Sequence, residues 1–228
     1  MSRLSKNILY NFFGKTILLI IGFIAVSYVF KQLGSDVVGI IYFALIMSSI
    51  LTAVLELGIA STTVREVAGS FGKDSSYIHN FFRTSSLFYW GGYVISSIII
   101  YFAVPLIVEY WINLQTLDIQ SAVFFLRILT ISAFLNLPRT LYSSIFRGLE
   151  RMEFNNIIDT ATTALQQIGI IVIIGLGFGL LPLAYWLSLS FVIWIGTYIF
   201  FVQRFFPWRA FIPGFFPAIV EKNKGYAS

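Results

Sequence analysis

The chain has no cysteine, one histidine and few charged residues, and each of these shortages excludes certain kinds of functional site. Without cysteine there can be no disulfide, no thiolate nucleophile and no zinc site built on sulfur. His79 stands alone, so a metal centre is not expected. Charged residues make up only 11% of the 228 residues, against about a quarter in soluble domains. A soluble enzyme with a polar surface is therefore a poor description of this sequence.

The chain is instead rich in apolar residues, which account for 58% of it. They occur in separate blocks that can each supply the roughly 20 residues a membrane-spanning helix needs. Six such spans are predicted, at 11–31, 37–58, 85–108, 121–144, 160–179 and 183–203. The expected fold is all-α, a polytopic membrane helical bundle of about six transmembrane helices. The predicted domains are the six-span bundle at 1–206 and an interfacial tail at 207–228.

The connection between the second and third spans is long enough to hold a helix of its own. Val64, Val67, Ala68 and Phe71 recur at helical spacing beside charged residues. This pattern predicts an amphipathic helix lying along the membrane interface between the second and third spans.

Lysine and arginine are distributed very unevenly between the two predicted sides of the membrane. Thirteen of the fifteen fall at the termini and in the second and fourth connections, Lys31 lies opposite, and Arg127 lies within a span. The positive-inside rule therefore predicts a cell-membrane protein with both termini cytoplasmic. The net charge of +5 does not indicate a nucleic-acid partner, because the basic residues form no dense run with interleaved aromatics.

Arg127 is the most unusual charged residue, because phenylalanine, leucine and isoleucine surround it in the fourth span. An arginine at mid-bilayer costs about 2.5–3.5 kcal/mol on insertion scales, and such residues normally face protein or water. We expect Arg127 to line a cavity, with snorkelling to the outer headgroups as the alternative.

Other polar residues could line the same path. In the first span Asn11 and Lys15 belong to a polar stripe, which serves equally well for helix packing. Glu56 and Arg65 could form a cytoplasmic polar gate, or simply a solvated helix end. Near the end of the fourth span, Asn136 and Arg139 either kink the helix or line a path. No outward loop is large enough for an active site, so we expect neither an enzyme nor a cofactor.

Several short motifs, in order along the chain, resemble the oligosaccharide flippase family. They are Asn7-x3-Asn11-x2-Gly14, Leu33-Gly34-x4-Gly39, Leu55-x-Leu57-Gly58, Arg65-Glu66-x-Ala68, and Phe146-Arg147-Gly148-Leu149-Glu150-Arg151. This is the Wzx-like branch of the multidrug/oligosaccharidyl-lipid/polysaccharide exporters. Each motif is short, and their order carries the resemblance.

The resemblance implies translocation of polyprenyl-phosphate-linked oligosaccharide, with the sugar and phosphate inside a cavity and the lipid tail in the bilayer. Family members usually have two six-helix bundles, whereas this chain supplies one. The expected partners are therefore membrane lipid, the polyprenyl-linked oligosaccharide and a second six-helix bundle, from another copy or a separate chain. The alternatives are half of a multidrug-type exporter, a non-transporting scaffold of a polysaccharide-assembly complex and, third, a membrane glycosyltransferase or ligase.

Overall fold

A computed structural model of the chain describes residues 3–56 and 58–223, with side chains for 15–56, 58–219, 221 and 222. Every regular element in these residues is helical. The elements are α1 (Arg3–Leu55), α2 (Ile59–Ser70), α3 (Ser75–Tyr110), α4 (Ile119–Ala133), α5 (Asn136–Gly148), α6 (Met152–Gly175), α7 (Leu180–Val202), the 3₁₀ helix η1 (Trp208–Phe211) and α8 (Pro217–Asn223). The predicted all-α polytopic bundle is confirmed.

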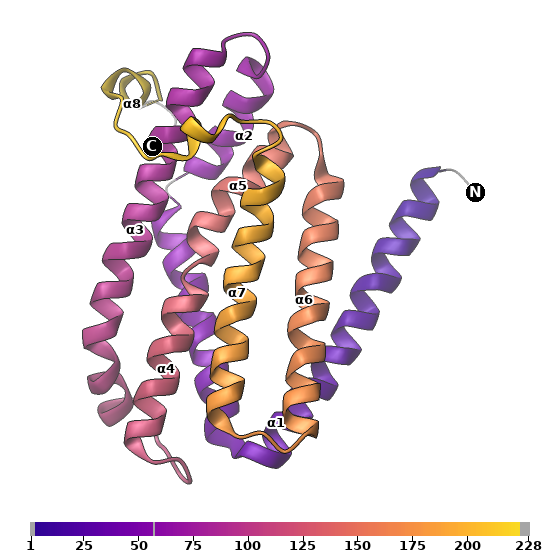
Figure 1. Cartoon of the computed structure of the whole chain (residues 1–228), viewed down its shortest axis with the longest axis vertical. Helices are drawn as coiled ribbons and strands as arrows, with labels where there is room; N and C mark the ends of the chain where they lie inside the picture. The colour runs from indigo at the N-terminus through magenta and orange to yellow at the C-terminus, as the bar shows by residue number, and fades with distance from the viewer. Residues whose placement is uncertain (1–2, 57, 224–228) are drawn as a thin grey trace.

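Helix α1 covers the first predicted span and nearly all of the second. Its 41-residue apolar part, Lys15–Leu55, would be about 60 Å long if straight, which is twice the hydrocarbon thickness. At Gly34 the backbone leaves the helix, with φ 87° and ψ 177°, a conformation that L side chains rarely adopt. The chain reverses there into two arms, residues 3–33 and 35–55 (Figure 1). In the part of the chain that the structure describes, five helices are long and apolar enough to cross a membrane, and the first of them is long enough to cross it twice.

The turn at Gly34 is fastened to the loop between α3 and α4. One carboxylate oxygen of the buried Asp36, Oδ2, accepts the backbone N–H groups of Gln115, Thr116 and Leu117 at 2.8–3.0 Å. The Thr116 hydroxyl donates to the same oxygen at 3.2 Å. This carboxylate therefore ties two loops at the same end of the bundle.

Helices α4 and α5 form a single broken span at the centre of the bundle. Pro138 has no N–H to donate to the carbonyl of Phe134, so that carbonyl instead accepts the N–H of Leu137 at 2.9 Å. The carbonyl of Ala133 thereby loses its usual donor. In its place, the Ser48 hydroxyl, from the second arm of α1, donates to the Ala133 carbonyl at 2.7 Å. The break is thus stabilised from the neighbouring helix.

The outer faces of the bundle are apolar, as contact with lipid requires. Large exposed hydrophobic side chains run along α1, α3, α6 and α7. The amphipathic helix predicted after the second span is α2, whose Ala60, Thr63 and Val67 are buried. Gly148 on α5 allows this close approach, because a Cβ there would meet Val67 and the carbonyl of Val64.

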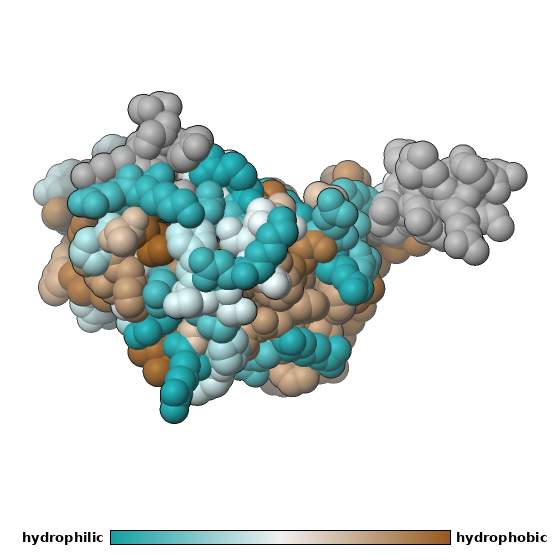
Figure 2. Space-filling view, turned by 90° about the horizontal axis from the view of Figure 1, so that it is seen from above, coloured by the Kyte–Doolittle hydropathy of each residue, from teal (hydrophilic) through white to brown (hydrophobic). Residues whose placement is uncertain are grey.

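One end of the bundle, here called the basic end, carries the start of α3, the junction of α5 with α6, and the end of α7. Arg65, Arg83, Arg147, Arg151 and Arg204 belong to it by their place along these helices. Figure 2 looks onto this end and shows hydrophilic side chains across it, with hydrophobic residues on the flanks. The opposite end carries Gly34, Lys31 and the loop from α3 to α4.

The carboxy-terminal tail is packed across the basic end. Arg83 donates through Nε to the carbonyl of Ile212 at 3.0 Å, and its own carbonyl accepts the N–H of Gly214 at 3.2 Å. Its guanidinium also lies over the Phe216 ring. The tail is thus held by α3.

Candidate functional site

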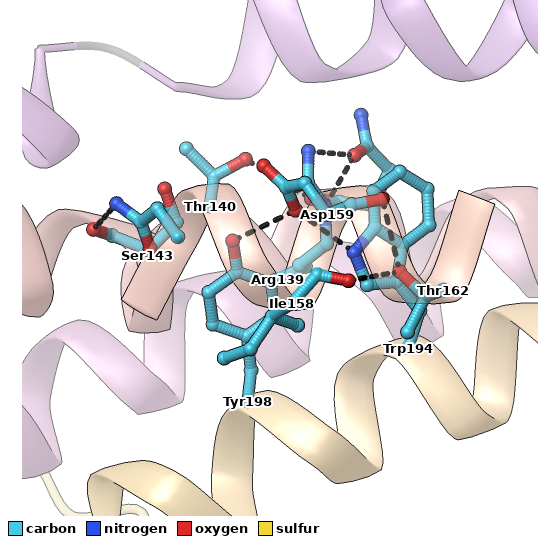
Figure 3. A network of polar contacts seen from close by, with 10 residues as sticks. Arg139, Thr140, Ser143, Ile158, Asp159, Thr162, Trp194 and Tyr198 are labelled. Carbon is cyan, nitrogen blue, oxygen red and sulfur yellow. Dashed lines mark hydrogen bonds and ion pairs between the residues drawn. The ribbon is translucent and has the colours of Figure 1, made fainter. Parts of the chain in front are cut away.

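An ion pair between Arg139 and Asp159 lies among apolar helices of the bundle. The Nη1 group of Arg139, on α5, donates to Oδ1 of Asp159, on α6, at 3.3 Å. Two aromatic side chains of α7 donate to the same oxygen, Trp194 through Nε1 at 2.9 Å and Tyr198 through its hydroxyl at 2.8 Å. Figure 3 shows Asp159 between Arg139 and these two aromatics. These four residues, with Asn136, are called the Asp159 cluster below.

The guanidinium of Arg139 is held from several sides. Its Nε and Nη2 groups donate to the Asn136 carbonyl oxygen at 2.9 and 2.6 Å. Its Cζ lies 4.4 Å from the centre of the Trp194 ring, a cation–π distance. Asn136 in turn donates to the Thr52 hydroxyl on α1 at 3.3 Å. The cluster therefore joins α1, α5, α6 and α7.

The break between α4 and α5 is what positions Asn136 and Arg139. Asn136 is the first residue of α5, and three residues on a helix bring Arg139 back to nearly the same face. On α7, Trp194 and Tyr198 are four residues apart and share one face. The cluster is thus assembled by helical spacing on three neighbouring elements.

One oxygen of the Asp159 carboxylate, Oδ2, has no hydrogen-bond partner among the described residues. All hydrogen bonds that the described residues donate to this carboxylate go to Oδ1, and 43% of the Asp159 side chain is exposed. Asp159 lies seven residues after the start of α6, about 10 Å in from the basic end. An acceptor of fixed orientation is thus open to a ligand that carries hydroxyl or N–H donors.

The structure brings two of the predicted site residues together, Asn136 and Arg139. Both lie near the end of the fourth predicted span, which the structure continues through α5 to Gly148. Their position in a transport cavity stays a prediction.

Glu56 and Arg65 are not paired with each other among the described residues. Arg65 donates to Glu66 at 2.9 Å, and Glu66 also accepts the Tyr77 hydroxyl at 2.8 Å. The half-buried Glu56 follows the end of α1. The polar gate that joins the two residues stays a prediction.

Lys15 is exposed on the first arm of α1, and the side chain of Asn11 lies outside the described residues. The amino-terminal part of this arm leans away from the other helices at the basic end (Figure 1). Further along the same arm, Gly22 packs against the amide of Gln167 on α6, where a Cβ would be only 2.8 Å from Nε2. Gly22, which lies on roughly the same side of the first span as Asn11 and Lys15, therefore serves close packing.

Arg127 lies in an open groove between α3 and α4. A separate, more enclosed cavity of about 210 Å³ lies between both arms of α1 and helices α4, α6 and α7. Leu129 lines that cavity, and a residue two positions away on a helix points about 200° from it. Arg127 therefore faces away from the enclosed cavity. It is also separate from the Asp159 cluster. Its assignment to a transport path stays a prediction.

Asp159, which accepts hydrogen bonds from three residues of the cluster, is not among the site residues predicted from the sequence. The fifth span was predicted to begin at 160, which placed Asp159 in a connection, whereas α6 begins at Met152. The eight residues from Met152 to Asp159 include Phe154, Ile157 and Ile158 at helical spacing. This spacing could have predicted that the helix begins before Asp159. The partners of Asp159 on α7, Trp194 and Tyr198, gave no signal of their own.

Comparisons with models of known protein families, with curated proteins and with solved structures find no match to this chain.

Proposed function

We propose that this chain is one half of a membrane transporter that translocates polyprenyl-phosphate-linked oligosaccharide, in keeping with its resemblance to the oligosaccharide flippases. The observation that carries the proposal is the Asp159 cluster. Charged residues are costly among apolar helices and are usually kept for substrate or ion pathways. A scaffold that only filled its place in a complex would need no such pair.

The chemistry of the cluster suits a sugar. The open oxygen of Asp159 can accept a sugar hydroxyl, and the fixed guanidinium of Arg139 limits the repulsion that a lone carboxylate would impose on a nearby phosphate. The surplus of arginine at the basic end attracts an anionic headgroup before it enters the bundle. The phosphate would thus first meet the arginines of the basic end, and the sugar would then meet the Asp159 cluster further in.

A single six-helix bundle supplies one wall of a two-walled path. An anionic headgroup that faced lipid on its other side would keep much of its desolvation cost, several kcal/mol for each unpaired group. We therefore expect the transporting unit to contain a second bundle that encloses the headgroup from the other side.

The test is transport by purified protein in vesicles, with a fluorescent polyprenyl-diphosphate sugar as substrate and cross-linking to report the oligomeric state. We expect movement across the bilayer only where two bundles are cross-linked. The Asp159→Asn variant should lower the rate about tenfold, the effect expected of one charge-assisted hydrogen bond. The matched control is Glu153→Gln, since Glu153 is on the same helix in an exposed pair with Arg151.

The outcomes separate the candidate functions. Transport by a demonstrated monomer would contradict the half-transporter. An absence of transport by the dimer, with the sugar lipid not bound, would favour the scaffold. A multidrug-type exporter would instead move cationic or neutral dyes and leave the sugar lipid in place.

A further inference from the structure

The Arg127 groove is another place where the bundle keeps a cation among apolar side chains, and no carboxylate of the described residues pairs with Arg127. The groove has a volume of about 590 Å³ and is lined by Tyr101, Ile119, Gln120, Val123, Phe124, Arg127, Ile128 and Ile131. Its apolar walls are exposed at Ile119 and Phe124, on the outer surface of the bundle. Whatever occupies the groove comes from the lipid side.

Two contacts with Tyr101 fix the guanidinium of Arg127. Its Nε donates to the Tyr101 carbonyl at 3.0 Å, and its Cζ lies 4.4 Å from the centre of the Tyr101 ring. Among the residues with described side chains, no group accepts from Nη1 or Nη2. Both NH₂ groups are therefore available to a ligand, while the side chain is held in one orientation.

The nearest acidic residues along the two helices do not neutralise this cation. Asp118 caps α4, and the backbone N–H of Ser121 that it accepts lowers the pKa of its carboxyl group. Glu109, near the end of α3, forms no ion pair among the described residues. Arg127 thus carries a charge that the described part of the chain leaves uncompensated.

The depth of Arg127 in the bundle and the shape of the groove indicate which kind of ligand the groove would bind. Arg127 lies eight residues after the start of α4, about 12 Å in from the opposite end. A bilayer places lipid phosphates near the helix ends and acyl chains beyond them. The groove offers a cation toward the headgroups and, further in, apolar walls at Ile128 and Ile131.

We propose that this groove binds one anionic phospholipid of the leaflet at the opposite end, its phosphate on the two NH₂ groups of Arg127 and one acyl chain along Ile128 and Ile131. The lipid supplies the counter-charge that the described residues do not. Arginine presents two parallel N–H donors to phosphate oxygens, the geometry that favours arginine at phosphate sites. The site is separate from the Asp159 cluster and does not depend on the proposed transport.

Native mass spectrometry of the whole purified chain tests the proposal. The protein is exchanged into micelles that contain equal amounts of phosphatidylglycerol and phosphatidylcholine with identical acyl chains, and the retained lipid is counted. We expect one phosphatidylglycerol to be held in preference to phosphatidylcholine. The Arg127→Gln variant should lower that preference about tenfold, and Arg127→Lys should retain part of it.

Two further variants distinguish binding in this groove from a general attraction of anionic lipid to the positive charges of the protein. Val123→Trp fills the groove and keeps the guanidinium, so it should also lose the bound lipid. Arg204→Gln removes another arginine that lies over aromatic rings, at the basic end, and should keep the lipid. Equal retention of the two lipids by the wild type, or an unchanged preference in Arg127→Gln, would overturn the proposal. Circular dichroism of each variant shows that the helices are intact.

Discussion

Each charge of the Arg139–Asp159 pair would be costly in the bundle without the other. Removing one partner leaves an uncompensated charge, whereas replacing both with apolar groups is often tolerated. We expect Asp159→Leu to lower the free energy of unfolding by about 2–3 kcal/mol, because three donors lose their acceptor. The double variant Arg139→Leu with Asp159→Leu should recover part of that loss. Unfolding in mixed micelles measures both.

The exposed pair of Arg151 and Glu153 is the control for this comparison. Its atoms are 3.5 Å apart and both side chains are more than half exposed. Replacing Glu153 with leucine should change stability by less than about 1 kcal/mol. If the double variant at 139 and 159 were less stable than Asp159→Leu, then the two side chains would not be coupled as the geometry implies.

At the level of elements, the break between α4 and α5 depends on a hydroxyl from another helix. Ser48→Ala removes the donor to the buried carbonyl of Ala133 and leaves that carbonyl without a partner. We expect a loss of about 1–2 kcal/mol in the free energy of unfolding. The neighbouring Ser49 is the matched control, because its exposed hydroxyl donates to the Leu45 carbonyl within its own helix. Equal effects of Ser48→Ala and Ser49→Ala would show that the break needs no support from α1.

Most of the helices could be predicted from the sequence, because lipid contact requires long apolar runs that are visible without any knowledge of packing. The turn at Gly34 fell between two such runs and was anticipated as a connection, although the helical backbone continues close to it on both sides. Contacts between helices could not be predicted from the sequence. Arg139 and Asp159 are twenty residues apart, on either side of the turn between α5 and α6, and their contact depends on how these two helices pack. The same holds for the orientation of Arg127, which depends on where α3 packs.

For the whole molecule, the uneven distribution of charge makes a prediction about orientation. The basic end carries most of the arginines, and the positive-inside rule places it in the cytoplasm, with both termini.

Because the chain has no cysteine, single introduced cysteines report the side of the membrane directly. Ser76 at the basic end and Asn113 at the opposite end are both exposed, and neither has a positive φ that would strain a cysteine. An impermeant maleimide added to intact cells should label Asn113→Cys and should reach Ser76→Cys only after the membrane is permeabilised. The reverse pattern would place the Asp159 cluster near the outer surface, so that its open carboxylate oxygen would meet a sugar after translocation and not before.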